Sequence, residues 1–334
     1  MVDAPLLRVS DLKTHFMIKE GVVRAVDGVS FTVEAGKVLG IVGESGCGKS
    51  MTARSILRLV PDPPGRIVGG EIEFDGIDIL SLSTRELQAI RGDRIAMIFQ
   101  DPMVSLNPTM RVGDQIVEVL TVHRGYSARA AVERAIELLR AVNIPEPETR
   151  IRDYPHQFSG GMRQRAMIAM ALACEPKLLI ADEPTTALDV TVQAQILDLL
   201  RVIREESDTA IILITHDLGM VAEMADDVVV MYAGKVVEQA SVHDLFDAPS
   251  HPYTQGLLKS LPSPQHRVEE LTPIRGQPPD LSRVPAGCSF APRCDHRMKI
   301  CSREEAPFRE LASGHRSRCW LDRAPDLGVP PPAG

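Results

Sequence analysis

The stretch Gly43-Glu-Ser-Gly-Cys-Gly-Lys49-Ser50 decides the fold of this chain. It follows an apolar run, residues 38–42, and precedes a helix-compatible segment, residues 51–60, which is the strand–loop–helix setting that the pattern G-x-x-x-x-G-K-S requires. The glycines let the backbone curl, so that successive N–H groups form an anion nest at a helix N-terminus. Lys49 is then expected to reach β- and γ-phosphates, and the Ser50 hydroxyl to bind Mg²⁺. The sequence predicts a nucleoside-triphosphate site.

Two further apolar runs end in polar side chains of the kind that phosphate chemistry needs. Residues 178–181 are apolar and lead into Asp182 and Glu183. We predict that Asp182 holds Mg²⁺ through its water shell and that Glu183 polarises a water for in-line attack on the γ-phosphate. Residues 211–215 lead into His216 at the carboxyl end of another strand, the edge at which open parallel sheets carry their active groups. We expect His216 to contact the γ-phosphate.

A serine and two glycines, Ser159-Gly160-Gly161, open an apolar stretch that is rich in Ala and Met. Ser159 is a good helix N-cap, and the glycines expose backbone N–H groups at the helix start. This predicts a second anion site, far from the first in sequence. Two such sites in one chain suggest that two chains share each nucleotide head to tail.

These motifs occur in a fixed order together with Gln100, in Ile98-Phe-Gln-Asp-Pro102, and Asp189, in Thr186-Ala-Leu-Asp189. The ordered set, across residues 6–240, resembles the ATP-binding cassette (ABC) ATPases. The resemblance implies an α/β fold with a P-loop NTPase core built on a RecA-like parallel sheet, an antiparallel β subdomain and a helical subdomain at about residues 101–165. The nucleotide-binding domain is expected over residues 1–245.

The resemblance also implies a role for each residue that matches a family motif. Gln100 would sense Mg²⁺, beside Ser50 and Asp182, and link the site to membrane subunits, and Asp189 would lie at the seam of an ATPase dimer. The ATP held by one chain would be contacted by Ser159, Gly160, Gly161 and Met162 of the other. The ATP-binding loop would comprise Gly43, Glu44, Ser45, Gly46, Cys47, Gly48, Lys49, Ser50 and Met51.

Two positions of this family pattern need comment. Phe16 is the candidate for stacking on adenine, with an ordinary core phenylalanine as the alternative. Met162 stands where the family usually has Gln. The phosphate-facing groups there are Ser159 and backbone amides, so we expect function to survive the change.

Composition and patterning bound the partners and the location. The formal net charge of −8 argues against a nucleic-acid partner, because binding phosphates needs a basic face. No apolar run approaches the ~18–20 residues that cross a bilayer, and residues 1–5 do not resemble an export signal. We therefore expect the chain at the cytoplasmic face of the membrane, attached through its partners.

The remaining patterns predict the secondary elements around the core. Residues 6–34 alternate as strands around a turn at residues 19–21, and residues 69–77 predict a further strand of the same antiparallel sheet. Residues 227–240 predict a hairpin that closes the core. A helix is expected over residues 128–142, ended by Pro145, with one apolar face made of Val132, Ala135, Ile136, Leu138 and Leu139.

The segment after the core carries His251-Pro-Tyr-Thr254 and four cysteines. Residues 245–322 resemble the C-terminal extension of oligopeptide and dipeptide importer ATPases, a branch that includes nickel importers. The resemblance implies a domain at residues 246–334, and we expect its Pro-rich end to be disordered. It also implies an ATPase that pairs with a second ATPase beneath two membrane permeases, fed by an extracellular binding protein. The second ATPase would be a paralogue or a second copy, and the solute a dipeptide, an oligopeptide, nickel or another molecule.

A different class of function remains as an alternative. Soluble ABC-type ATPases act on macromolecules in translation or DNA repair, without a membrane. They typically carry two cassettes or a long coiled coil within the core, and the sequence has neither feature.

The four cysteines of the extension predict a site for a metal group. Cys288, Cys294, Cys301 and Cys319 are separated by five, six and 17 residues. A reducing cytosol disfavours disulfides, and zinc knuckles usually begin with closely spaced pairs. Thiolates on loops with little apolar content favour a [4Fe–4S] cluster that fastens the extension, with zinc or free thiols as alternatives. The other two, Cys47 and Cys174, are expected to be small buried residues.

Overall fold

The computed structural model describes residues 4–186, 189–260, 273–312 and 314–321. The chain forms two compact units and passes between them more than once. The first unit contains residues 1–6, 33–38 and 78–214, and the second contains residues 7–32, 39–77 and 215–334. The predicted disorder of the C-terminal residues 330–334 lies outside the described residues.

The first unit is built on parallel strands. Strands β6 (Ile95–Ile98), β7 (Leu178–Asp182) and β8 (Ala210–Thr215) lie in that order, with β7 parallel to both neighbours. Every residue of the three strands is buried. Near-continuous apolar runs are typical of parallel strands that are covered on both faces. The parallel strands predicted from residues 178–181 and 211–215 are confirmed, and β6 is a further strand that was not predicted.

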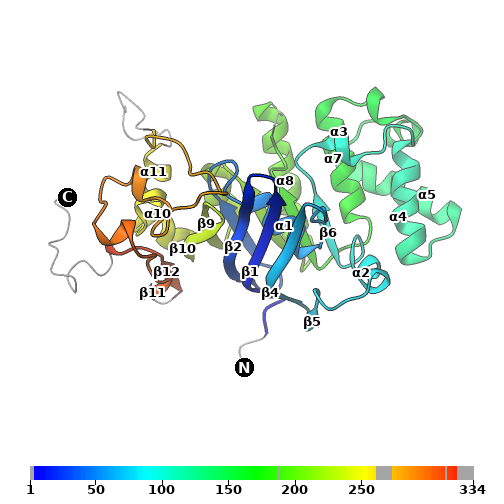
Figure 1. Cartoon of the computed structure of the whole chain (residues 1–334). Helices are drawn as coiled ribbons and strands as arrows, with labels where there is room; N and C mark the ends of the chain where they lie inside the picture. Colours follow the sequence, from blue (N-terminus) through cyan, green and yellow to red (C-terminus); the bar gives the residue numbers. More distant parts are fainter. Residues whose placement is uncertain (1–3, 187–188, 261–272, 313, 322–334) are drawn as a thin grey trace. The chain divides into compact units, whose positions relative to one another are not determined.

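Helices make up most of the rest of this unit (Figure 1). Their bounds are α2 (Thr84–Ile90), α3 (Pro102–Ser105), α4 (Val112–Arg124), α5 (Ala128–Ala141), α6 (Pro147–Arg150), α7 (Gly160–Leu172) and α8 (Val190–Glu206), with a 3₁₀ turn, η1 (Pro155–Gln157), before α7. Helix α5 begins after the Ser127 cap, as an ST-type N-cap favours. The predicted apolar face was partly wrong: Val132 is 42% exposed, while Ala131 is buried. The buried face begins at Ala131 and not at Val132. With 3.6 residues per turn, the residue four positions before Ala135 lies on the same face of the helix as Ala135.

The second unit contains the predicted antiparallel sheet. Its strands are β1 (Leu7–Ile18), β2 (Gly21–Val33), β4 (Gly65–Phe74) and β5 (Ile77–Asp78), in the order β2-β1-β4-β5. Strands β1 and β4 pair antiparallel, and Phe16 lies opposite Gly65. The strand predicted over residues 69–77 therefore begins four residues earlier and breaks at Asp75–Gly76, where both residues have positive φ.

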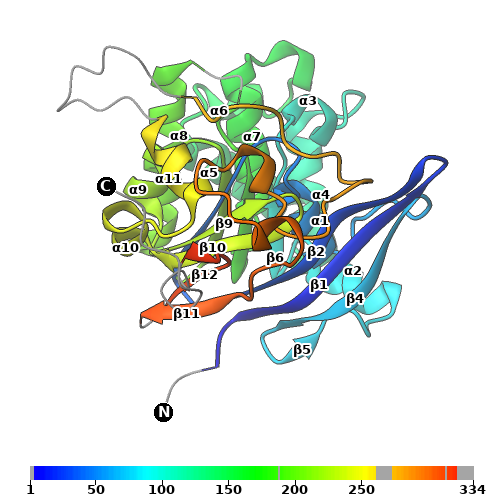
Figure 2. The ribbon, with the colours of Figure 1, turned by 60° about the vertical axis from the view of Figure 1, so that its left-hand side comes forward.

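The same unit joins the phosphate loop to the C-terminal extension through one run of strands. Strand β3 (Val38–Val42) pairs in parallel with β9 (Asp227–Tyr232), and β9 pairs antiparallel with β10 (Lys235–Ser241), which confirms the predicted hairpin. The extension then adds β12 (His315–Ser317) to β10, and β11 (Arg309–Ala312) to β12, as Figure 2 shows. The extension thus continues the sheet on which the loop stands.

The helices of this unit are short. They are α1 (Lys49–Ile56), α9 (Leu218–Met224), α10 (Val242–Asp247) and α11 (Pro252–Lys259), with 3₁₀ turns η2 (Ala291–Arg293) and η3 (Ile300–Ser302). Across the described ranges of the chain, none of the helices has the length and apolar character of a membrane span.

Candidate ATP site and cysteine pocket

The phosphate loop runs from the end of β3 to the start of α1, and its glycines are required by its shape. Gly43, Gly46 and Gly48 have φ values of 151°, 79° and 107°, which side chains rarely allow. A Cβ at Gly43 would lie 2.2 Å from the Met231 carbonyl oxygen, and one at Gly48 would lie 2.3 Å from that of Ala25. Only glycine fits at either position, so the local backbone is the nest that the motif predicts.

Lys49 is buried at the first position of α1. Its ammonium donates to the carbonyl oxygens of Gly43, at 2.6 Å, and of Glu44, at 3.1 Å. The helix N-cap is Gly48, which has no side chain to satisfy the first N–H groups. A phosphate is the kind of anion that such a helix start attracts, so the residues present fit the predicted ligand. Cys47 is buried, as predicted, and burial raises the pKa of its thiol.

Glu44, within the loop, is held by two residues of the C-terminal extension. Its backbone N–H donates to the Tyr253 hydroxyl at 2.8 Å. Its carboxylate makes a bidentate ion pair with Arg293, at 2.6 and 2.9 Å. Sequence reasoning missed both contacts. The motif leaves the residue type at position 44 open, so nothing local signals its partners.

The predicted catalytic carboxylate lies in the first unit, at the end of β7. Asp182 and Glu183 are both buried, and Glu183 has a positive φ of 48°. One Glu183 carboxylate oxygen accepts from the Gln100 amide at 3.0 Å and from the Thr186 hydroxyl at 2.7 Å. The structure therefore brings Gln100 and Glu183 together. Thr186 lies in the motif that ends at Asp189, and its contact with Glu183 was not predicted.

The predicted partner-facing residues lie at two helix starts of the first unit. The Ser159 hydroxyl caps α7 by accepting from the Met162 N–H at 3.3 Å, and Ser159 and Gly160 are exposed. A Cβ at Gly161 would lie 3.0 Å from the Val192 side chain. The N–H of that valine donates to Asp189, which caps α8, at 2.9 Å. Ala187 and Leu188 of the same motif lie outside the described residues.

Two predicted ATP contacts lie in the second unit. Phe16 is half-buried, and its ring packs over Gly65, where a Cβ would lie 2.7 Å from it. His216 is exposed directly after β8. The remaining residues of the loop, Ser45, Ser50 and Met51, lie with them in this unit, whereas Gln100, Asp182 and Glu183 lie in the other.

The His251-Pro-Tyr segment begins α11 and is anchored by a buried carboxylate. Glu238, on β10, has no exposed surface and accepts from the N–H of His251 at 2.9 Å and from His315 Nε2 at 2.8 Å. The His251 ring caps α11 by accepting from the Tyr253 N–H at 3.1 Å. Burial, and then the charge of Arg318, lower the pKa of His251 to about 3, so its ring is neutral.

The four cysteines of the extension line one pocket. Its wall contains Cys288, Cys294, Cys301 and Cys319, together with the rings of Phe290 and Trp320. Burial, and then the charge of neighbouring thiols, raise the pKa of Cys294 to about 11, and burial also raises that of Cys288.

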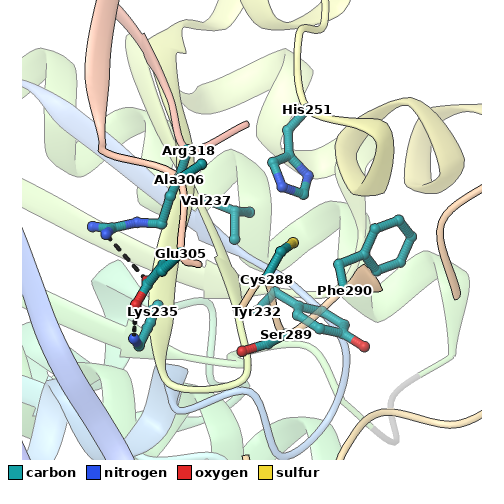
Figure 3. A pocket seen from close by; sticks show the side chains of 10 residues that line it. All are labelled: Tyr232, Lys235, Val237, His251, Cys288, Ser289, Phe290, Glu305, Ala306 and Arg318. Carbon is teal, nitrogen blue, oxygen red and sulfur yellow. Dashed lines mark hydrogen bonds and ion pairs between the residues drawn. The ribbon is translucent and has the colours of Figure 1, made fainter. Parts of the chain in front are cut away.

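A second pocket shares Cys288 with the first. In Figure 3, Glu305 faces Lys235 and Arg318 on one side, the rings of His251 and Phe290 lie on the other, and Cys288 lies between them. The ion pairs measure 2.5 Å from Lys235 to Glu305 and 3.2 Å from Arg318 to Glu305.

None of the six cysteines forms a disulfide. Among the residues that the structure describes, no group of three or more His, Cys, Asp or Glu side chains is arranged to hold a metal ion. The cluster therefore stays a prediction. Cys174 is buried, as predicted.

A glycine cradle that ends in a lysine at a helix start, and a buried carboxylate pair at the end of a parallel strand, define a P-loop nucleoside triphosphatase. The family model "ABC transporter" matches residues 26–186, and "Oligopeptide/dipeptide transporter, C-terminal region" matches residues 237–301. The chain therefore belongs to the ATP-binding cassette family, as an ATPase of the oligopeptide and dipeptide transporter branch. The predicted family and fold class are confirmed.

Individual relatives agree with this family. The oligopeptide transport ATP-binding protein OppD of Bacillus subtilis is 54% identical over 98% of this chain and 92% of its own length. The dipeptide transport ATP-binding protein DppD of the same species is 52% identical over 95% of this chain and 94% of its own. A solved dimeric ATP-binding cassette in a post-hydrolysis state, bound to ADP and Pi, matches with a TM-score of 0.64 and 28% identity over 71% of this chain and 98% of that chain.

Proposed function

We propose that this protein is the ATP-hydrolysing subunit of a peptide importer, working with a second ATPase beneath two membrane permeases at the cytoplasmic face of the membrane. The observation that carries the proposal is the presence of both family matches, residues 26–186 and 237–301, in one chain. Relatives of nearly equal length are named for oligopeptide and dipeptide transport. An extracellular binding protein would deliver the peptide, so this chain would not touch it.

The proposed roles at the nucleotide follow from the side chains present. Lys49 and the loop amides would hold the β- and γ-phosphates, with Phe16 on the adenine and His216 on the γ-phosphate. Ser50, Asp182 and Gln100 would hold Mg²⁺, which withdraws charge from the phosphates when bound. Glu183 would orient the attacking water, and its contacts with Gln100 and Thr186 support the role because they fix its carboxylate.

The second anion site would be completed by the other ATPase. Ser159, Gly160, Gly161 and Met162 would close over the nucleotide held by the partner, and Asp189 would lie at the seam. Exposure of Ser159 and Gly160 supports this role. ATP would then favour the closed dimer, and its hydrolysis would release the two chains, since a ligand shifts an equilibrium toward the state that binds it better. We expect the partner to be a paralogue, with a second copy as the alternative.

Glu183→Gln tests the proposed hydrolysis. We expect the variant to bind ATP, to accumulate as a closed dimer and to lose roughly 10²–10⁴-fold in turnover, the usual contribution of a general base. Size-exclusion chromatography with ATP and a phosphate-release assay measure both effects. Glu118→Gln, on the exposed face of α4, is the matched control and should behave as wild type. Wild-type turnover in Glu183→Gln would remove the role proposed for this residue.

Purification of the tagged chain from detergent-solubilised membranes tests the proposed setting. Co-purification of two permeases and a second ATPase, with peptide-stimulated ATP hydrolysis, supports the importer. Stimulation by nickel instead of peptide would identify another solute. Association with ribosomes or DNA, and no permease, would favour a soluble ATPase acting on a macromolecule.

We propose that the four cysteines of the extension ligate a [4Fe–4S] cluster. All four line one pocket, which supports the proposal because a cluster needs four thiolates around a common space. Binding would require the four side chains to close around the iron, since they do not form a ligand group in the described residues. Burial raises the pKa of Cys288 and Cys294 when no cation is bound. The iron of a bound cluster would lower these pKa values, because a metal ion deprotonates the thiols that ligate it. The cluster would fasten the loops of the extension and would take no part in hydrolysis.

Anaerobic purification tests the cluster. Brown protein, with absorbance near ~400 nm and about four irons per chain, is expected if all four cysteines bind one cluster. Cys294→Ser should lose the iron, and Cys174→Ser, a buried cysteine elsewhere, should keep it. Zinc or no metal in the wild type would overturn the assignment.

A further inference from the structure

The phosphate loop contains an acidic residue at a place where acid is unfavourable. Glu44 follows the first glycine of the loop, and the motif imposes no residue type there. A carboxylate beside the site of a polyphosphate would repel it, because like charges a few ångströms apart interact strongly near a protein surface. Something must offset this charge if the loop is to bind ATP.

Arg293 of the C-terminal extension supplies that compensation. Its guanidinium donates to both Glu44 carboxylate oxygens, at 2.6 and 2.9 Å, and only 4% of its side chain is exposed. The Arg293 Nε also donates to the Arg275 carbonyl oxygen at 2.9 Å, which fixes the orientation of the fork. A bidentate pair of this kind has defined geometry as well as charge.

The backbone of Glu44 is fixed as well as its side chain. Tyr253, fully buried, accepts the Glu44 N–H at 2.8 Å, and Lys49 donates to the Glu44 carbonyl oxygen at 3.1 Å. A shift of the Glu44 backbone would therefore move the Lys49 ammonium, which donates to it. Two residues 209 and 249 positions away along the chain thus hold one residue of the phosphate loop from outside.

The Arg293 side chain belongs to the structure around the cysteines. It lies next to Cys294, and the turn that carries it is closed by hydrogen bonds from the Ala291 N–H to the Cys288 carbonyl, at 3.0 Å, and from the Arg293 N–H to that of Phe290, at 2.9 Å. The Phe290 ring packs edge-on against Tyr232, with centroids 5.3 Å apart. The segment between the first two cysteines of the pocket is thus the one that reaches the phosphate loop.

We infer that Arg293 is a positioning residue for ATP binding, through which the C-terminal extension neutralises and orients Glu44 in the phosphate loop of its own chain. The inference rests on the assignment of residues 43–50 as the ATP-phosphate site. It gives the extension a function in nucleotide affinity, separate from any metal group in its pocket.

The test is a double-mutant cycle on Arg293 and Glu44 in the full chain, read by equilibrium binding of a fluorescent ATP analogue and by KM and kcat. Arg293→Ala should weaken ATP binding by about tenfold, because Glu44 is left unpaired beside the phosphates. KM should carry most of the change, since the residue does not touch the reacting atoms. In the E44Q background the same substitution should cost less than about threefold, because no charge remains to be offset.

Two further variants keep the test decisive. Arg293→Lys retains the charge but not the two-pronged guanidinium, so its loss of ATP affinity should lie between those of wild type and Arg293→Ala. Arg293→Gln removes the charge and keeps most of the side-chain volume, so it should weaken ATP binding about as much as Arg293→Ala. Arg297→Ala is the matched control, because Arg297 is an exposed arginine of the same extension whose side chain donates to the Ser302 hydroxyl and not to the phosphate loop.

Three outcomes separate the possibilities. Equal losses in the Glu44 and E44Q backgrounds would show a general structural role and overturn the inference. Unchanged ATP binding in both Arg293→Ala and Arg293→Gln would overturn it as well. Failure of the wild-type chain to bind ATP would instead remove the proposed function.

Discussion

Helices α1 and α7 both have a glycine at their start, Gly48 as the N-cap of α1 and Gly160 as the first residue of α7, but the two starts are built differently. At α1, Gly48 has a φ of 107°, and a Cβ there would lie 2.3 Å from the Ala25 carbonyl oxygen. At α7, Gly160 is exposed, a Cβ there would meet no heavy atom within 4 Å, and the Ser159 hydroxyl caps the helix. The first glycine is demanded by the chain's own packing. No contact with the residues that the structure describes demands the second.

The difference bears on how each site would be completed. A nest whose shape is fixed by its own backbone can bind phosphate within one chain. An exposed helix start at which the chain itself leaves room suits the approach of another molecule. This agrees with the proposal that α7 closes over the nucleotide of a second ATPase, and it suggests variants that affect one start and not the other.

The largest effect is expected at the first start. Gly48→Ala forces a side chain into the Ala25 carbonyl at a φ that side chains rarely adopt, so ATP binding should weaken by about 100-fold or more. Gly46→Ala is the matched control: its φ is also positive, at 79°, but its Cβ would meet nothing within 4 Å. It should cost about fivefold to thirtyfold, which corresponds to the ~1–2 kcal/mol of a left-handed residue. Titration with a fluorescent ATP analogue measures both.

Similar losses in the two glycine variants would contradict the steric argument. They would mean that positive φ, and not the Ala25 contact, sets the cost. Thermal melts of each variant separate loss of ATP affinity from loss of the fold.

A graded effect is expected at the second start. Gly160→Ala, Gly160→Leu and Gly160→Trp should all fold, because the position is open and alanine favours helix over glycine. ATP binding to the isolated chain should stay near wild type. The rate of hydrolysis should fall as the side chain grows, by about tenfold or more for Trp, because a partner could no longer close on α7. Hydrolysis measured against protein concentration tests this. Equal activity across the series would argue against a partner at this face.

The comparison also shows what the sequence can and cannot predict. The phosphate loop and the apolar parallel strands are local patterns, so their positions followed from consecutive residues. The ion pair between Arg293 and Glu44 joins residues 249 positions apart and has no local pattern. The burial of Glu238 could not be expected from its charge, because it depends on partners contributed by the loop before α11 and by β12. The Val132 error arose at the boundary of the apolar face, where a helical pattern alone is least decisive.

A smaller effect is expected from the second support of the phosphate loop. Tyr253→Phe keeps the ring that packs against Tyr232, with centroids 4.6 Å apart, and removes the hydroxyl that accepts from Glu44. The loss of one hydrogen bond, about 0.5–1.5 kcal/mol, should weaken ATP binding by roughly threefold to tenfold with little change in thermal stability. Tyr154→Phe, in the first unit, is a control that should bind ATP as wild type does. No change in Tyr253→Phe would show that the loop holds its shape without this contact.

The smallest effect concerns a third helix start, α11, which is closed by a buried titratable side chain. His251 caps this helix as a neutral ring, and its pKa is lowered to about 3, chiefly by burial and also by Arg318. In the unfolded chain its pKa is near 6.5, so between the two values the unfolded state binds more protons and stability rises with pH. The contribution of His251 is complete above about pH 6.5 and is lost progressively as the pH falls toward 3.

His251→Asn isolates this contribution, because asparagine can cap the helix but does not titrate in this range. Between pH 7.5 and 5.5 the melting temperature of the wild type should fall by roughly 2–4 °C more than that of the variant, the shift that about 1 kcal/mol produces in a large domain. Differential scanning calorimetry of the two proteins at both pH values provides the measurement. The same fall in both would mean that the acid sensitivity arises elsewhere, and a larger fall in the variant would contradict a neutral, buried His251. The contrast with α7 is then physical: a helix start sealed by a buried ring responds to pH through that ring, whereas an open start capped by Ser159 has no titrating cap to respond.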